Sequence, residues 1–485
     1  MKLSCLAENL PAGFILESPA AEIWQSEIGK VTSSIWQVEE GSLFIAVRGA
    51  NFDGESLCEE AERRGAAAVV CQTLKKKSKK TLVVRDSREA LAYLTAAFYG
   101  RPADRMTLIG VTGTNGKSTV AGMTEHILCA CGKKTGIVGT VENRVGKESF
   151  SSGLTTPEPE NLHRMFSEMC KEQSEYAVME VSSHAADQKR IAGIDFEVGI
   201  FTNLTEDHLD YHRTMENYKK AKLSFFDQCK AGILNKDCVY YDDFAEKCKG
   251  YAYSLRDRNA AFYACNIMTG TDWETSGGTS FDMVAFGTAF PVRLKIPGLF
   301  NVYNAAAAFG ACSILGFPPE KIANALSTFS GVRGRMELVR AGTPYNIIID
   351  FAHTPDGLLN LLCAAREFTS GRIIVVFGCG GDRDRFKRPI MGKIADKYAD
   401  IRVVTSDNPR TEDPESIIGE ILSGMKKSEE TYVIEDRKQA IAKALKIAQA
   451  GDTVLIAGKG HEAYQTVGTE KKPFDERAIV WELLS

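Results

Sequence analysis

The chain has 485 residues, of which 44% are hydrophobic and 25% are charged, and this profile is typical of a globular protein with two or three domains. Its formal net charge of -4 lacks the basic surplus that general nucleic-acid binding needs, so we expect no nucleic-acid partner. No apolar run reaches the roughly 18 residues of a membrane span, and the segment from Met1 to Leu16 has no signal-peptide core. The 13 cysteines are scattered without a C-x-x-C pair, which favours mostly buried thiols in a reducing compartment. We therefore expect a cytoplasmic protein that does not insert into a membrane.

Alternating strands and helices divide the chain into three stretches. The first ends near residue 103, after expected strands at 42–47 and 67–70. The second opens with a strand at 106–111 and has further strand-like runs at 176–181 and 198–204. The third carries a helix at 437–449 between apolar runs, at 347–349, 373–377, 401–405 and 453–457. This alternation is the signature of doubly wound sheets, so we expect an α/β protein with domains at 1–103, 104–335 and 336–485.

A glycine-rich turn follows the strand at 106–111 and leads into a helix. Its sequence is Gly110-Val-Thr-Gly-Thr-Asn-Gly-Lys-Ser-Thr119. Small residues allow backbone N–H groups to surround phosphate oxygens at a helix N-terminus, while Lys117 reaches the terminal phosphates and Ser118 ligates Mg²⁺. Val111 stands where the strict P-loop has glycine, so the string is a variant form. The alternative is a turn that only links strand to helix. The predicted ATP-binding residues are Gly113, Thr114, Asn115, Gly116, Lys117, Ser118 and Thr119.

Two polar strings follow the next strands of this stretch. Glu180 ends the run at 176–181, and His208 lies in Asn203-Leu-Thr-Glu-Asp-His-Leu-Asp-Tyr-His212. Polar residues at strand ends are where a parallel sheet presents its chemistry, so Ser118, Glu180 and His208 are candidate magnesium ligands. Taken singly, Glu180 also suits a helix cap. His208 and His212 have the spacing of two zinc ligands, although no further Cys or His cluster accompanies them.

These strings resemble the Mur ligase family, and the variant loop T-G-T-N-G-K-S is also found in folylpolyglutamate synthetases. Three later segments match the family in order and spacing, namely Pro297–Asn304, Gly334–Glu337 and Asp350–Asp356. The resemblance implies a P-loop-type central ATPase domain, a Rossmann-like C-terminal domain and a first domain that binds a uridine nucleotide. It also implies a monomer that uses ATP and Mg²⁺, with further ATP contacts from Asn301, Asn304, Arg335 and Asp350.

Family members join a carboxylate to an amine through an acyl phosphate, and the resemblance assigns four catalytic residues. These are Lys117, Glu180, His208 and Lys222. Lys222 stands where the family carries a lysine modified to a carbamate, which would give Mg²⁺ an anionic oxygen ligand where an ammonium would repel it. Nothing in the local sequence separates Lys222 from the other lysines of its segment.

The resemblance is closest to the members that add the third residue of the peptidoglycan stem peptide. It implies contacts to UDP-N-acetylmuramoyl-L-alanyl-D-glutamate from Ser33, Ala50, Asn51, Phe52, Thr155, Thr156, Ser182, Gln188 and Arg190. One string departs from the family, because Ser34-Ile35-Trp36 replaces the usual D-S-R. This change implies either weaker nucleotide binding or stacking of Trp36 on the uracil, and it leaves room for a paralogue with another acyl substrate.

The third stretch carries Asp407-Asn-Pro-Arg410, which in the family marks enzymes that add meso-2,6-diaminopimelate rather than lysine. Diaminopimelate has a distal carboxylate that lysine lacks, and an arginine fork binds such a group through two charge-assisted hydrogen bonds. The implied acceptor contacts are Arg383, Asp407, Asn408, Pro409, Arg410, Gly458 and Glu462. A surface salt bridge is the alternative for Arg410. A lysine-adding enzyme and a folylpolyglutamate-type ligase are the alternatives for the whole chain.

Overall fold

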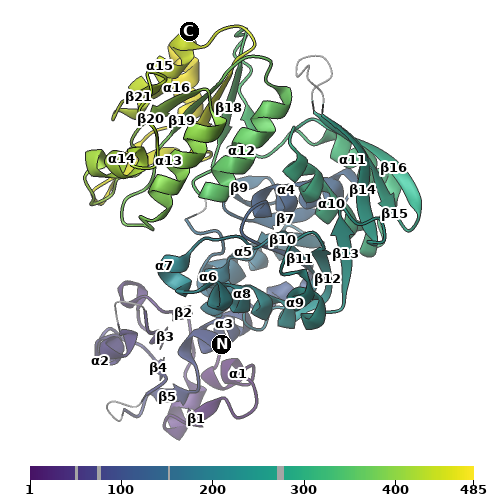
Figure 1. Ribbon diagram of the computed structural model, residues 1–485. Coiled ribbons are helices and arrows are strands. Elements are labelled where there is room, and N and C mark those ends of the chain that lie inside the picture. Colours follow the sequence, from purple (N-terminus) through teal and green to yellow (C-terminus); the bar gives the residue numbers. More distant parts are fainter. Residues whose placement is uncertain (50–52, 74–77, 151–152, 270–277) are drawn as a thin grey trace.

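The structure is a computed structural model that describes residues 1–49, 53–73, 78–150, 153–269 and 278–485. Within these residues the strands form three larger sheets and one two-stranded sheet. Figure 1 shows the three sheet-centred units in a row, with the N-terminal unit (purple) at one end and the C-terminal unit (green to yellow) at the other. The expected three-domain α/β architecture is confirmed.

The first unit is a five-stranded sheet with the order β1-β5-β4-β3-β2. Its neighbouring strands are parallel except for β1 and β5. Three of them, β3 to β5, are buried from end to end, as expected of a parallel sheet with both faces covered. The strands are β1 (Ile15–Glu17), β2 (Lys30–Thr32), β3 (Ser42–Ile45), β4 (Ala68–Cys71) and β5 (Thr81–Val84), with helices α1 (Leu3–Ala7), α2 (Cys58–Arg63) and α3 (Ser87–Phe98).

The second unit is an eleven-stranded sheet with the order β16-β15-β14-β13-β12-β11-β6-β10-β7-β8-β9. Its centre is parallel, while β15, β16, β8 and β9 are antiparallel additions at the two edges. The parallel centre places the carboxyl ends of β6, β10 and β11 side by side. The strands are β6 (Thr107–Thr112), β7 (Thr135–Val138), β8 (Asn143–Val145), β9 (Glu148–Phe150), β10 (Tyr176–Glu180), β11 (Phe196–Phe201), β12 (Cys229–Asn235), β13 (Gly250–Ser254), β14 (Phe262–Thr269), β15 (Thr279–Ala285) and β16 (Thr288–Leu294).

Helices cover both faces of this central sheet and bury two separate cores. One core joins the sheet to α4 (Lys117–Ala130), α10 (Leu299–Ile314) and α11 (Pro319–Thr328). The other joins it to α5 (Pro159–Lys171), α8 (Met215–Phe225) and α9 (Tyr241–Lys247). Two short helices, α6 (Ser183–Asp187) and α7 (Leu209–His212), follow β10 and β11.

The third unit is a six-stranded sheet with the order β17-β18-β22-β19-β20-β21, parallel except for β17. Helices α12 (Pro355–Phe368), α13 (Lys387–Tyr398) and α14 (Pro414–Leu422) cover one face, and α15 (Arg437–Ile447) and α16 (Glu476–Leu484) cover the other. The strands are β17 (Glu337–Leu338), β18 (Asn346–Asp350), β19 (Ile373–Phe377), β20 (Ile401–Val404), β21 (Thr431–Val433) and β22 (Thr453–Ala457), followed by the separate hairpin β23 (Tyr464–Val467) and β24 (Glu470–Pro473).

All 13 cysteines are free thiols. Three of them are buried, three are exposed and the rest keep partial exposure, so the expectation of mostly buried thiols is wrong. In the described parts of the chain, no helix has the length and apolar character needed to cross a membrane.

Candidate active site

The phosphate loop lies between β6 and α4, at the carboxyl edge of the central sheet. Gly113 and Gly116 have φ angles of +146° and +85°, which a residue with a side chain rarely adopts. A Cβ on Gly116 would also stand 2.4 Å from Oδ1 of Asn304 on α10. The loop therefore needs glycine at both places, and it leaves the N-terminus of a 14-residue helix open to an anion.

Two lysines converge on this loop, of which Lys222 is buried and Lys117 is partly buried. Lys117 Nζ donates to the carbonyl oxygens of Gly113 (3.0 Å) and Thr114 (2.9 Å), and Lys222 Nζ donates to the same Gly113 oxygen at 2.8 Å. Burial lowers the pKa of both amines, and the charge of Lys117 lowers the pKa of Lys222 further. Lys222 is only 1% exposed. The lysine-rich sequence around it did not predict this burial. An anionic phosphate at this loop would relieve the repulsion between the two amines.

Glu180 ends β10 beside the loop, and its carboxylate has three partners. Oε2 accepts from Ser118 Oγ at 3.0 Å and from Thr140 Oγ1 at 2.9 Å, while Oε1 accepts from Thr140 N at 2.7 Å. Two oxygens in neighbouring positions around Mg²⁺, each at about 2.1 Å, stand roughly 3.0 Å apart. The carboxylate of Glu180 and the hydroxyl of Ser118 therefore fit the two protein ligands of a magnesium ion.

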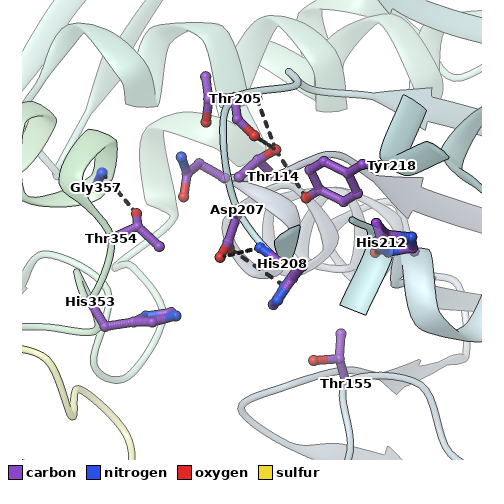
Figure 2. A network of polar contacts seen from close by, with 12 residues as sticks. Thr114, Thr155, Thr205, Asp207, His208, His212, Tyr218, His353, Thr354 and Gly357 are labelled. Atoms are coloured by element: carbon purple, nitrogen blue, oxygen red, sulfur yellow. Dashed lines mark hydrogen bonds and ion pairs between the residues drawn. The ribbon is translucent and has the colours of Figure 1, made fainter. Parts of the chain in front are cut away.

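His208 follows β11 and begins α7 with a φ angle of +55°. Its Nε2 lies 3.5 Å from Asp207 Oδ2, and its ring packs against His184 with centroids 4.9 Å apart. Figure 2 shows His208 beside Asp207, with His353 of the third unit across from them. Burial lowers the pKa of His208 to about 4, and the charges of Lys117 and Lys222 also lower it. His208 is thus a neutral imidazole near the two lysines, as a metal ligand requires.

The zinc alternative at His208 and His212 finds no support. His212 Nε2 is hydrogen-bonded to Ser183 Oγ at 2.9 Å. Nowhere in the described ranges do three His, Cys, Asp or Glu side chains gather as a metal-binding group. The hard oxygen ligands at Glu180 and Ser118 suit Mg²⁺ better than Zn²⁺.

A cavity of about 820 Å³ lies between the central and third units, next to the phosphate loop. This volume falls in the range of small-molecule sites. Arg335 enters from the hinge and donates Nη2 to Ser118 Oγ at 3.2 Å, and Asp350 accepts from Met336 N at 2.7 Å. The predicted ATP-binding residues in the cavity wall are Asn115, Gly116, Thr119, Asn301, Asn304, Arg335 and Asp350.

The predicted dipeptide contacts of the central unit gather around the end of β10. Thr156 Oγ1 donates to Glu180 O at 2.7 Å and accepts from Ser182 N at 3.0 Å. Arg190 donates to Thr156 O at 2.8 Å and to Gln188 Oε1 at 2.7 Å. Thr155 joins them through Thr140, since the two hydroxyl oxygens are hydrogen-bonded to each other at 3.0 Å. The structure therefore brings all five predicted residues of this unit together.

The predicted nucleotide contacts of the first unit are only partly described. Ser33 donates its N–H and hydroxyl to Glu160 Oε1 on α5, at 3.0 and 2.7 Å, so it lies at the boundary with the central unit. Ala50, Asn51 and Phe52 lie outside the described residues. In the departing string, Ile35 is buried, whereas Trp36 is 82% exposed with the Arg64 guanidinium 5.2 Å from its ring centroid.

The predicted acceptor contacts form a single cluster in the third unit. Asn408 Nδ2 donates to Glu462 Oε2 at 2.9 Å. Gly458 has a φ angle of +121°, and a Cβ there would stand 2.6 Å from Asp407 Oδ2. A Cβ on Gly381 would stand 1.8 Å from the carbonyl oxygen of Pro409. Pro409 therefore packs against the loop that carries Arg383.

Arg410 is half-buried rather than engaged in a surface salt bridge. Its Nη1 donates to the carbonyl of Gly381 at 2.6 Å. Burial lowers the pKa of Arg410, and the nearby charge of Arg383 lowers it further, against the opposing effect of Asp407 and Glu462. Two neighbouring guanidinium groups have the charge and the donors to bind a carboxylate.

The hinge at Gly334 joins the phosphate site to the acceptor cluster. A Cβ on Gly334 would stand 2.1 Å from His461 N, so the hinge backbone packs directly on the string that carries Gly458 and Glu462. Nearby, Asn115 Nδ2 of the loop donates to Asp356 Oδ2 of α12 at 2.6 Å. The third unit is therefore closed onto the central one.

Sequence reasoning missed several residues of this site. Thr140 holds Glu180, Asp356 holds Asn115, and Lys459 donates to Asn408 Oδ1 at 3.0 Å and Glu462 Oε2 at 3.1 Å. Thr140 follows the parallel strand β7, so its place at a strand end was a usable signal.

Three sheet-centred units, with a phosphate loop hydrogen-bonded to the third of them, fit the architecture of an ATP-dependent ligase. Family models match over three ranges: residues 30–99 (Mur ligase family, catalytic domain), 111–312 (Mur ligase middle domain) and 334–460 (Mur ligase, glutamate ligase domain). The chain belongs to the Mur ligase family.

Curated relatives align over nearly the whole chain. UDP-N-acetylmuramoyl-L-alanyl-D-glutamate--2,6-diaminopimelate ligase 1 of Clostridium acetobutylicum is 43% identical over 464 residues, which cover 94% of this chain and 95% of that protein. UDP-N-acetylmuramoyl-L-alanyl-D-glutamate--2,6-diaminopimelate ligase of Geobacillus thermodenitrificans is 42% identical over 492 residues, which cover 99% of this chain and 98% of that protein.

Solved structures share the fold over the same length. A structure of UDP-N-acetylmuramoyl-L-alanyl-D-glutamate--2,6-diaminopimelate ligase is 31% identical with a TM-score of 0.70 and covers 100% of this chain and 99% of its own. MurF ligase from Thermotoga maritima, solved in complex with ADP, is 19% identical with a TM-score of 0.62 and covers 95% and 96%. The second likeness concerns the fold alone.

Proposed function

We propose that this chain adds meso-2,6-diaminopimelate to UDP-N-acetylmuramoyl-L-alanyl-D-glutamate, converting ATP to ADP and phosphate, as a monomer in cytoplasmic peptidoglycan precursor synthesis. The names of relatives at 42% and 43% identity support the reaction. The proposed domains are a uridine-nucleotide domain (1–103), a central ATP-binding ligase domain (104–335) and an amino-acid domain (336–485).

One observation carries the proposal. Arg335 donates to Ser118 at the phosphate site, and the adjacent Gly334 packs on the backbone of Gly460 and His461. A two-residue hinge thus joins the site that would activate a carboxylate to the string that would hold an amine. An amide ligase needs these two sites in contact, because its activated acyl group must meet the amine before water does.

The residues of the phosphate site would hold the reacting groups. Lys117 and Arg335 would donate to the γ-phosphoryl oxygens of ATP, while Thr155, Thr156 and Arg190 hold the dipeptide. Ser118 and Glu180 would hold one Mg²⁺, and Glu180, His208 and a carbamate on Lys222 would hold a second. Bound there, the two ions would supply positive charge that screens the phosphates from the substrate carboxylate.

The reaction would proceed in two displacements at this site. A D-glutamyl carboxylate oxygen bonds to the γ-phosphorus and the bond to ADP breaks, which leaves an acyl phosphate. The acceptor amine then bonds to the acyl carbon, and phosphate departs. Glu462 and Asp407 would hold acceptor ammonium groups, and Arg383 and Arg410 would hold the distal carboxylate.

An acceptor panel tests the proposal. Purified protein, the nucleotide dipeptide, ATP and Mg²⁺ are mixed with meso-diaminopimelate, L-lysine or no acceptor, and ADP release is measured. We expect turnover with diaminopimelate and a rate lower by a factor on the order of 10⁴ with lysine, because lysine leaves the arginine donors unpaired. Comparable turnover with lysine would favour the lysine-adding alternative. A parallel reaction with a folate in place of the nucleotide dipeptide and glutamate as the acceptor is included, and turnover in that reaction alone would favour the folylpolyglutamate alternative.

A further inference from the structure

Two loops of the third unit carry the arginine pair, and we call them the acceptor loops: residues 380–383 and 407–412. They are tied to each other by several hydrogen bonds. Gly381 N donates to Asn408 O at 2.9 Å, and Arg410 Nη1 donates to Gly381 O at 2.6 Å. Thr411 donates through Oγ1 and N to the carboxylate of Asp382, at 2.7 and 3.2 Å. The spacing between Arg383 and Arg410 therefore depends on how these loops are held.

Each acceptor loop contains a strained residue. Asp382 and Arg410 have φ angles of +52° and +53°, a left-handed conformation that costs roughly 1–3 kcal/mol for residues other than glycine. Arg410 is held there by the hairpin β23–β24, since its N–H donates to Thr466 O and its carbonyl accepts from Gly468 N, at 3.1 and 2.7 Å. Asp382 is held through its carboxylate by Thr411, and its backbone N–H has a separate restraint.

That restraint comes from Glu412, and behind it from Arg388 on α13. Glu412 Oε1 accepts from Asp382 N at 2.5 Å. Both carboxylate oxygens of Glu412 also accept from the Arg388 guanidinium, at 2.8 and 2.9 Å. Arg388 further donates Nη2 to Gly380 O at 3.1 Å. One guanidinium thus contacts both acceptor loops, directly at residue 380 and through the carboxylate of residue 412.

Arg388 is a buried charge with a fixed position. Its side chain is 0% exposed, and a buried guanidinium is stable only where carboxylates pair with it. Hydrogen bonds from Arg388 hold the pKa of Glu412 at about 2, so the pair stays ionised at any pH of interest.

Glu420 on α14 is an internal control within the same network. Its Oε2 accepts from Arg388 Nη1 at 2.8 Å, and its carboxylate also pairs with Arg385. Neither contact reaches an acceptor loop. Glu412 and Glu420 therefore share one arginine, but only Glu412 transmits its position to Asp382.

We propose that Arg388, acting through Glu412, is a positioning residue that sets the distance between Arg383 and Arg410 and thereby the selectivity for an acceptor with a distal carboxylate. The inference rests on the proposed function and assigns a role to two residues outside the acceptor contacts.

The test compares Glu412→Gln with Glu420→Gln, which is the same change on the same arginine. Glutamine keeps the shape of Glu412 but turns one acceptor oxygen into a donor, which faces Arg388 in either orientation and also faces Asp382 N in one of them. We expect Glu412→Gln to raise the KM for meso-diaminopimelate by at least about tenfold, since misplacement of a receptor group by about 1 Å costs up to 10²-fold. The KM for ATP and for the nucleotide dipeptide should stay within about twofold, and the preference for diaminopimelate over lysine should narrow. Glu420→Gln should change none of these values more than about threefold.

Arg388→Lys serves as the second variant, because lysine keeps the charge but cannot form the two-pronged pair. Arg388→Lys should raise the KM for meso-diaminopimelate. Thermal unfolding of each variant verifies that the protein is folded. Equal effects of Glu412→Gln and Glu420→Gln, or a rise in all three KM values together, would overturn the inference while leaving the proposed function intact. A wild-type protein without diaminopimelate-dependent turnover would instead overturn the proposed function.

Discussion

Single residues of the candidate site differ in how far the sequence predicted them. Lys117, Ser118 and Glu180 stand beside strand ends in recognisable strings, and the structure brings them to one sheet edge. Lys222 is different. It lies in a lysine-rich helix next to Lys220, which is largely exposed, and only the packing of α8 under the phosphate loop buries it. Burial of one lysine among several depends on the helix orientation, which no short string encodes.

Lys117→Ala should abolish ATP-dependent ADP release, to below about 1% of wild type, because electrostatic groups of this kind contribute factors of 10²–10³ or more. Lys220→Ala on α8 is the control and should retain near wild-type turnover. The measurement is ADP formation with saturating nucleotide dipeptide and diaminopimelate. Retained turnover in Lys117→Ala would contradict the phosphate-loop assignment.

Helices and strands followed their sequence patterns closely where the apolar runs were continuous. The runs at 373–377 and 453–457 became β19 and β22 without change, whereas the expected strand at 42–47 ends at Ile45. The antiparallel edge β14–β16 was not predicted. Its strands follow one another as β-hairpins rather than as strand–helix units, so the doubly wound pattern that identified the other strands does not apply to them.

Helix α3 offers a test at this scale. Asp86 caps it by accepting from Arg88 N at 2.8 Å and Glu89 N at 3.0 Å. Asp86→Ala should lower the free energy of unfolding by about 1 kcal/mol, and Asp86→Asn, which keeps a capping oxygen, should lower it much less. Chemical denaturation of the three proteins measures the difference. Equal loss in both variants would show that the cap does not stabilise α3.

The whole molecule depends on contacts that the sequence did not reveal. Asn115 and Asp356 are 241 residues apart, and Ser33 and Glu160 are 127 apart, yet each pair forms a hydrogen bond between units. Such contacts depend on how finished domains dock, which local patterns do not specify. The order of the three domains and a hinge at Gly334 were predictable from the family resemblance, but the residue pairs that meet between the units were not.

His163, on α5, makes the stability of the whole fold depend on pH. The residue is 1% exposed, neither ring nitrogen has a hydrogen-bond partner, and burial lowers its pKa from 6.5 to about 4. Between these two values the unfolded chain binds the proton and the folded chain does not, so stability falls as the pH drops from about 6.5 towards 4. From pH 7 to pH 5 the loss due to His163 amounts to about 2 kcal/mol. His163→Leu should remove that part of the pH dependence. Any difference in the free energy of unfolding between the two proteins at pH 8 then reflects the changed packing alone. Denaturation midpoints at pH 5, 7 and 8 measure it, and parallel pH profiles for the two proteins would contradict the role of His163.

The most direct test of the proposed function is a competition between acceptors. Wild-type protein and Arg410→Ala are each given ATP, Mg²⁺, UDP-N-acetylmuramoyl-L-alanyl-D-glutamate and equal amounts of meso-diaminopimelate and L-lysine, and the amide products are quantified by mass spectrometry. We predict that the wild-type product carries diaminopimelate almost exclusively and that Arg410→Ala loses most of this preference. A wild-type product that carries mainly lysine would contradict the assignment.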